Sequence, residues 1–115
     1  MVRLEQTRGD TRGYKFARKN SAGQVITTAP DALFVTVKTD WNTGDIVFQK
    51  PMEEMTLDEE GVWHWHTEPA DTAKLPYGEY YGDVEVHKNG GIFTISKFIF
   101  DVTVETTWSS GEEEF

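Results

Sequence analysis

The chain contains no cysteine, which excludes a disulfide framework and any metal site built on thiolates. It also lacks an apolar run approaching the roughly 20 residues that a membrane-spanning helix needs. The first residues, Met1 to Gln6, have no apolar stretch of the kind found in secretory signal peptides. We therefore expect a protein that is not secreted by a signal peptide and has no membrane partner.

Basic residues are scarce: 11 Lys and Arg stand against 20 Asp and Glu, for a formal net charge of −9. An acidic surface repels the phosphate backbone, which supplies most nucleic-acid affinity. It repels anionic lipid headgroups for the same reason. We therefore expect no nucleic-acid partner, and we interpret the charge as serving solubility.

Long helical periodicity is absent as well, and apolar residues recur at alternate positions instead. Turn signals separate these segments at intervals of roughly 8–12 residues, as in β-sandwiches. The sequence predicts one all-β domain over residues 1–105, an Ig-like antiparallel β-sandwich of 7–8 strands, followed by an acidic tail over 106–115. The predicted strands are residues 2–5, 14–17, 25–26, 33–38, 46–48, 62–66, 80–87 and 93–104.

The last predicted strand changes the parity of its apolar positions. Phe93 and Ile95 are expected on the buried face, but the next apolar residue of that face is Phe98 rather than residue 97. An extra residue that shifts the alternation is typical of a β-bulge. We predict a bulge near Ser96–Lys97.

A tyrosine corner is predicted where the chain enters the strand at residue 80. Leu75 and Pro76 open a β-turn that Gly78 closes, and Tyr80 follows two residues later. In Ig-like sandwiches a tyrosine at this spacing donates its hydroxyl hydrogen to backbone a few residues upstream. We expect Tyr80 to be buried with its hydroxyl bonded, and Tyr81 to face outward.

Three histidines are the weak candidates for a metal site. His64 and His66 alternate on one predicted strand, so their rings point the same way and could share an ion. His87, or the carboxylates of Asp83 and Glu85, could supply a third ligand, but only if their strand lies beside that of His64 and His66. The simpler interpretation, which we favour, places both histidines on the solvent face of a strand whose Trp63 and Trp65 fill the core. No metal or other cofactor is therefore expected.

Signatures of covalent catalysis are missing too. The sequence has no Gly-x-Ser-x-Gly elbow and no glycine-rich phosphate loop. Its paired carboxylates fall in predicted loops and in the tail, where nothing would separate their pKa values. Arg8-Gly9-Asp10 is interpreted as a turn. We expect a protein without enzymatic activity.

Four aromatic residues form the candidate binding surface: Trp41, Tyr77, Tyr81 and Trp108. Exposed Trp and Tyr are enriched in protein interfaces, and their flat rings also suit saccharide stacking. The alternative is that these side chains only cap the open ends of the sandwich. Both interpretations remain open on the sequence alone.

Several segments together resemble a known family. An Arg-Gly-Asp-Thr turn precedes an aromatic strand (residues 8–16), and a glycine-containing hairpin follows (20–23). A strand ends in Thr-Val-Lys (36–38), and the corner block with its opening helical turn spans residues 69–86. Residues 98–104 then form a closing Phe-rich strand. In order and spacing, the chain resembles the β-sandwich domains of tailed bacteriophages and prophages, such as the N-terminal domain of baseplate upper proteins and small tail or neck components.

This resemblance implies a virion structural module whose partners are other tail or baseplate proteins, with homo-oligomerisation as a further expectation. It implies assembly in the host bacterial cytoplasm and then a place in the virion. The family brings no catalytic residues. The Trp-His-Trp-His strand (63–66) and the acidic loop (53–60) depart from its pattern. A saccharide-binding or host-surface-binding module and a metal-binding protein remain the alternatives.

Overall fold

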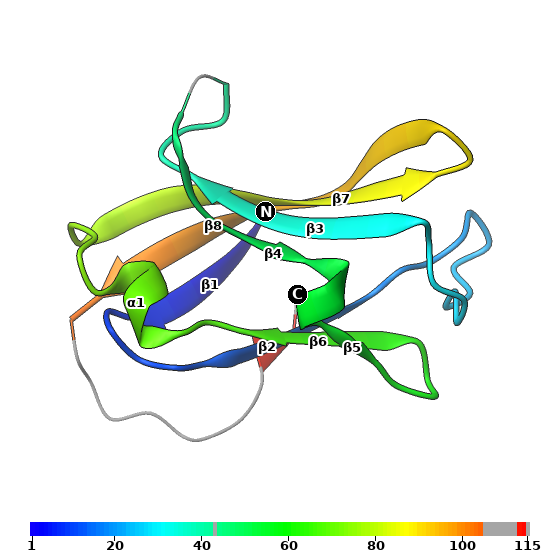
Figure 1. Ribbon diagram of the computed structural model, residues 1–115, viewed down its shortest axis with the longest axis horizontal. Coiled ribbons are helices and arrows are strands. Elements are labelled where there is room, and N and C mark those ends of the chain that lie inside the picture. The colour runs from blue at the N-terminus through cyan, green and yellow to red at the C-terminus, as the bar shows by residue number, and fades with distance from the viewer. Residues whose placement is uncertain (43, 105–112, 115) are drawn as a thin grey trace.

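Two β-sheets face each other across the core in the computed structural model, which describes residues 1–42, 44–104 and the backbone of 113–114 (Figure 1). The strands are β1 (Val2–Thr7), β2 (Gly13–Ala17), β3 (Ala32–Lys38), β4 (Ile46–Pro51), β5 (Thr56–Leu57), β6 (Val62–His66), β7 (Gly78–Lys88), β8 (Gly91–Thr103) and β9 (Glu113–Glu114). A 3-10 turn η1 (Met52–Glu54) and one helical turn α1 (Pro69–Thr72) complete the described elements. The prediction of an all-β sandwich is confirmed.

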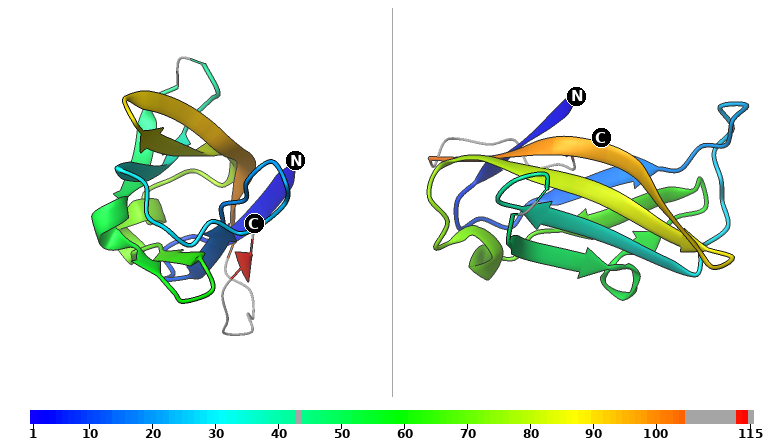
Figure 2. Two further views of the ribbon diagram at one scale, coloured as in Figure 1. Left: turned by 90° about the vertical axis from the view of Figure 1, so that its right-hand side faces the viewer. Right: turned by 90° about the horizontal axis from the view of Figure 1, so that it is seen from above.

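The first sheet has the strand order β1-β8-β7-β3-β4, and the second has the order β5-β6-β2-β9 (Figure 2). Alternating residues of both sheets point inward, as their period of two requires. Trp63 and Trp65 are buried, as predicted, and the Trp65 ring stacks on Tyr14 with the ring centroids 4.7 Å apart. From the first sheet, Phe48 and Phe100 pack against each other in the same core.

Two pairings among the described residues differ from the predicted antiparallel arrangement: the short β9 runs parallel to β2, and β1 runs parallel to its neighbour β8. β1 runs parallel to β8, from Val2 opposite Phe98 to Thr7 opposite Thr103. The chain leaves β1 for the other sheet rather than turning back in a hairpin, so β1 need not be antiparallel to its neighbour. The described residues also form nine strands, because β5 and β9 add two-residue edges that the alternation did not reveal.

The predicted strand at residues 25–26 is wrong. Only an isolated pairing joins Val25 to Lys19, and the chain between them forms a tight turn. The side-chain oxygen of Asn20 accepts hydrogen bonds from the backbone N–H groups of Ala22 and Gln24, at 2.9 and 3.0 Å. Such side-chain bonds to backbone compete with strand pairing, which explains the short hairpin without a ladder.

The predicted burial of Phe93 and Ile95 is also wrong, since they are 55% and 43% exposed. The bulge itself is present one residue earlier than predicted. Val84 pairs with Ser96 and Glu85 pairs with Thr94, which leaves Ile95 as the extra residue. This end of β8 extends past the start of β1, so β1 does not flank it.

The tyrosine corner has the predicted geometry. The Tyr80 hydroxyl donates a hydrogen bond to the carbonyl of Pro76 at 2.8 Å, and burial raises the pKa of that hydroxyl. Gly78 adopts φ 134°, a conformation that other residues rarely adopt. Just upstream, Asp71 accepts a hydrogen bond from the Glu68 amide at 2.7 Å, as expected for a capping side chain. The corner therefore fixes the entry of β7.

A buried polar network joins the two sheets where the chain crosses between them. Gln6 is fully buried, and its amide nitrogen donates to the carbonyls of Thr7 and Asp10, both at 2.9 Å. Its side-chain oxygen accepts from the Tyr14 hydroxyl at 2.8 Å and from the Thr67 hydroxyl at 3.0 Å. All four hydrogen-bonding positions of the amide are thus satisfied.

Replacing Gln6 with Leu should lower the free energy of unfolding by about 2–4 kcal/mol, because the buried groups around it lose their partners. Gln49→Leu is the matched control, since the exposed Gln49 makes a single side-chain bond within the described residues, to Thr36. We expect that change to cost about 1 kcal/mol or less. Urea unfolding measures both, and equal losses would show that the network adds no stability.

Candidate functional site

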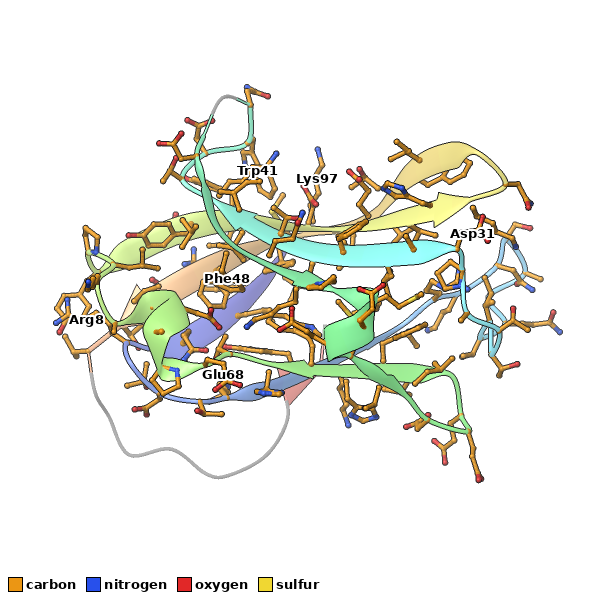
Figure 3. All side chains as sticks on the ribbon, viewed as in Figure 1. Arg8, Asp31, Trp41, Phe48, Glu68 and Lys97 are labelled. Atoms are coloured by element: carbon orange, nitrogen blue, oxygen red, sulfur yellow. The ribbon has the colours of Figure 1, made fainter. Side chains whose placement is uncertain are left out.

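Trp41, Tyr81 and Lys97 meet on the outer face of the first sheet. The rings of Trp41 and Tyr81 are 5.0 Å apart between centroids, and the Lys97 ammonium lies 5.5 Å from the centroid of the Trp41 ring. Figure 3 shows Trp41 and Lys97 on the same outward side of the sheet. We call these three residues the aromatic face. The structure thus brings together two of the four predicted aromatic site residues.

The loop after β3 carries Trp41 over this face. Asp40 accepts a hydrogen bond from the Asn42 amide at 2.9 Å, and Thr39 accepts one from the Asp45 amide at 3.0 Å. These two bonds bend the chain back toward β4, so the ring of Trp41 lies against Tyr81 on β7. The fold therefore places the tryptophan through loop geometry rather than through strand alternation.

Asp83 borders the aromatic face on β7. It pairs across the strands with Lys97, and Lys38 is the other nearby cation. Burial raises the pKa of the Asp83 carboxyl, and the negative charge of Glu85 adds to this, although the two lysines act in the opposite direction. The ionised carboxylate is therefore less favourable here than in water.

Tyr77 lies elsewhere. Its ring is covered by the guanidinium of Arg8, whose central carbon is 4.0 Å from the ring centroid. Arg8 also donates to the Leu75 carbonyl at 3.3 Å. Figure 3 places Arg8 at the end of the sandwich, away from Trp41. Trp108, the fourth predicted residue, lies outside the described residues, so the four do not make one surface in the part of the chain that the structure describes.

The histidines do not gather. β6 and β7 belong to different sheets, so His87 does not lie beside His64 and His66, and the condition for a three-histidine site is not met. Each ring contacts its own carboxylate instead: His64 with Asp58 at 2.9 Å, His66 with Glu68 at 2.7 Å and His87 with Glu85 at 2.8 Å. The bond from His64 helps to hold the pKa of Asp58 below its usual range. No three His, Asp or Glu side chains cluster for a metal within residues 1–42 and 44–104.

An exposed strand edge was also expected as part of the binding surface, but the sequence did not indicate which edge it would be. Residues 91–97 of β8 pair with β7 on one side, and within the described chain no strand pairs with their other side. We call this segment the free edge. Ile92, Phe93 and Ile95 are exposed along it. The signal was present in the run Ile-Phe-Thr-Ile, which is apolar on both faces of a strand.

Comparison with protein-family models gives no match, and comparison with curated proteins gives none either. Among the described residues, no helix has the length and apolar character needed to cross a membrane. Function is therefore inferred from the aromatic face, the free edge and their surroundings.

Asp83→Asn should raise stability at pH 7. Because the folded pKa lies above the unfolded value, the ionised carboxylate costs stability above the folded pKa, and that cost vanishes below the unfolded pKa of about 3.9. The melting temperature of the variant should therefore exceed that of the natural protein at pH 7, and the two should converge as the pH falls to about 3.

Asp58→Asn serves as the control of opposite sign. Its folded pKa is lowered, so the carboxylate contributes stability above the unfolded pKa that is lost as the pH falls through the folded pKa. This variant should be less stable at pH 7. If Asp83→Asn also loses stability at pH 7, the attraction of Lys38 and Lys97 outweighs burial.

Proposed function

We propose that this chain is a non-enzymatic structural module that assembles with other proteins through the free edge of β8. The carrying observation is the exposure of Ile92, Phe93 and Ile95, at 64%, 55% and 43%, on a strand segment that has no neighbour on one side among the described residues. Unpaired backbone N–H and C=O groups of such an edge form hydrogen bonds with an added strand. Apolar side chains beside them add buried area on association.

β1, the terminal strand on this side of the first sheet, is protected against accidental strand pairing, unlike the free edge. β1 carries the exposed charges Arg3 and Glu5 along its outer face, and charged side chains discourage accidental pairing. The free edge has no proline and a single charge, Lys97, at its end. An edge left without these protective residues favours a specific partner that covers it.

The resemblance of residues 8–106 to tailed-phage and prophage domains supplies the setting of the proposal. The partners would be other tail or baseplate proteins, met in the host bacterial cytoplasm during assembly of the virion. A second copy of the chain is the alternative occupant, in a ring-like homo-oligomer. Nothing in the proposal requires a cofactor.

Phe93→Lys and Ile95→Lys should each weaken assembly by about tenfold or more, because a strand added to the edge would have to desolvate the new charge. The measurement is co-expression with the proteins encoded by neighbouring genes, followed by light scattering on a sizing column. Folding should be unaffected, since both positions are exposed.

Ile46→Lys is the matched control: Ile46 is 58% exposed and lies at the start of β4, far from β8 in the strand order. Complexes should survive this change. Assembly that tolerates lysine at 93 and 95 but fails with lysine at 46 would contradict the proposed edge.

A second candidate function is saccharide binding at the aromatic face. The observation that favours it is a Trp–Tyr pair on the outer sheet face flanked by the charged groups of Lys97 and Asp83. Sugars stack on aromatic rings and bond to charged groups beside them. The outer face of the sheet thus presents both kinds of contact side by side.

On a glycan array, Trp41→Ala and Tyr81→Ala should then each lower binding by about fivefold or more, as expected for the loss of one aromatic contact of about 1 kcal/mol or more. Tyr77→Ala should leave binding unchanged, because Tyr77 lies against Arg8 and not on the aromatic face. An array on which the natural protein binds no glycan would remove this candidate.

A further inference from the structure

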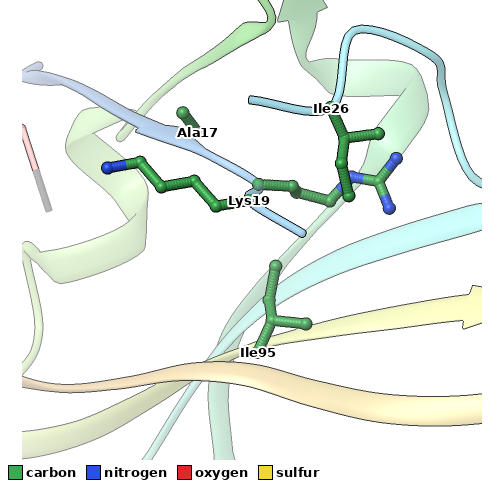
Figure 4. A pocket seen from close by; sticks show the side chains of 5 residues that line it. Ala17, Lys19, Ile26 and Ile95 are labelled. Carbon is green, nitrogen blue, oxygen red and sulfur yellow. The ribbon is translucent and has the colours of Figure 1, made fainter. Parts of the chain in front are cut away.

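An open pocket of about 350 Å³ lies between β2 and β8, next to the free edge. It is lined by Ala17, Arg18, Lys19, Ile26 and Ile95. Figure 4 shows Ile26 and Ile95 entering from opposite sides, with their side chains pointing toward each other. The pocket therefore has an apolar wall, which includes Ile95 from the bulge of β8, and two cations, Arg18 and Lys19, which follow β2.

Arg18 is an unusual cation because it is buried, with only 6% of the residue exposed. Its burial follows from the alternation, since Tyr14, Phe16 and Arg18 continue the inward face of β2. One terminal nitrogen donates to the Thr28 carbonyl at 2.6 Å, whereas the Nε group has no hydrogen-bond partner among the described residues. Burial lowers the pKa of this guanidinium.

No carboxylate of the described residues pairs with Arg18 or with the exposed Lys19 beside it. The protein carries nearly twice as many acids as bases, so the lack of a carboxylate partner for this buried cation among the described residues stands out. Buried charges are normally paired, because an isolated charge is costly away from water. An incoming anionic group would satisfy the guanidinium.

The pocket and the free edge lie on the same side of the sandwich, since Ile95 belongs to both. β1 covers β8 from Phe98 onward, and β9 covers β2 only at Tyr14 and Lys15. Beyond these points β2 and β8 have no neighbour on this side within the described residues. The acidic segment β9 already adds to β2 here as a parallel strand, directly before the pocket.

We propose that the free edge of β8 receives an extended segment of a partner protein whose apolar residues cover Phe93 and Ile95 and whose glutamate or aspartate enters the pocket to pair with Arg18. This inference rests on the proposed function and adds the chemistry of the partner. Charge complementarity carries it, since a carboxylate accepts two hydrogen bonds from a guanidinium and supplies the missing counter-charge.

A second copy of this chain would fit less well. The free edge, Gly-Ile-Phe-Thr-Ile-Ser-Lys, contains no acid, so two such edges paired together bring no carboxylate to either pocket. They would instead bring Lys97 of each copy to an interface that already holds Arg18 and Lys19. Like charges at an interface disfavour that pairing.

The test uses synthetic eight-residue peptides of alternating valine and threonine, with one glutamate moved along the series and a glutamine twin for each. Fluorescence anisotropy gives their affinities for the full chain, and amide chemical shifts locate the site. At least one glutamate peptide should bind about tenfold more tightly than its twin. Amide shifts should fall on residues 17–19 and 91–97.

Arg18→Met should abolish the difference between the twins, and Lys15→Gln, outside the pocket lining, should preserve it. The methionine variant should be as stable as the natural protein or more so, because it removes an unpaired buried charge. If this variant nevertheless fails to fold, the affinities of each glutamate peptide and its glutamine twin for the natural protein still test the pairing with Arg18.

Twins that bind the natural protein equally would overturn the pairing with Arg18, while weakening of both by Phe93→Lys would leave the proposed function standing. Binding by no peptide of the series at about 1 mM would also overturn the inference, and the co-expression experiment then judges the proposed function by itself. A dimer in sedimentation that Phe93→Lys dissolves would overturn it in favour of a second copy.

Discussion

The buried amide of Gln6 holds the point where the chain leaves one sheet and enters the other. Its four hydrogen bonds tie the end of β1, the following turn, β2 and the residue after β6 together. The Thr72 hydroxyl accepts a hydrogen bond from the Gly9 amide at 2.8 Å and thereby ties α1, which precedes the corner, to the same crossing. Because a satisfied buried network has one good geometry, it specifies how the two sheets face each other.

The position of β1 follows from that crossing and in turn decides which part of β8 has no neighbouring strand among the described residues. With its end fixed at Gln6 and Thr7, β1 lies parallel to β8 and flanks it only from Phe98 onward. The bulge at Ile95 then turns the remaining part of β8 out of regular alternation. β1 begins opposite Phe98, whereas β8 extends back to Gly91. The free edge therefore lies in the part of β8 that β1 does not reach, and Ile95 in this part also lines the pocket at Arg18.

Features set by neighbouring residues could be predicted from the sequence. The corner at Tyr80 and the burial of Trp63 and Trp65 depend on spacing within a few positions, and the structure has both. The bulge followed from a parity change that is equally local. Features that depend on distant partners could not be predicted: nothing near Gln6 indicates that Thr67 will meet it. Burial of Phe93 depended on whether another strand reached it, which alternation does not encode.

Electrostatics opposes the proposed contact at long range, through the net charge of the protein, and favours it at short range, through Arg18. A net charge of −9 repels an acidic segment at a distance, and salt screens that repulsion over roughly 8–10 Å. Inside the pocket, Arg18 is screened far less because it is buried. An acidic partner would thus associate slowly, because the net charges repel, but its carboxylate would bind Arg18 strongly once inside the pocket. Such a combination admits a segment that also supplies apolar residues for the free edge, and it rejects acidic chains that supply charge alone.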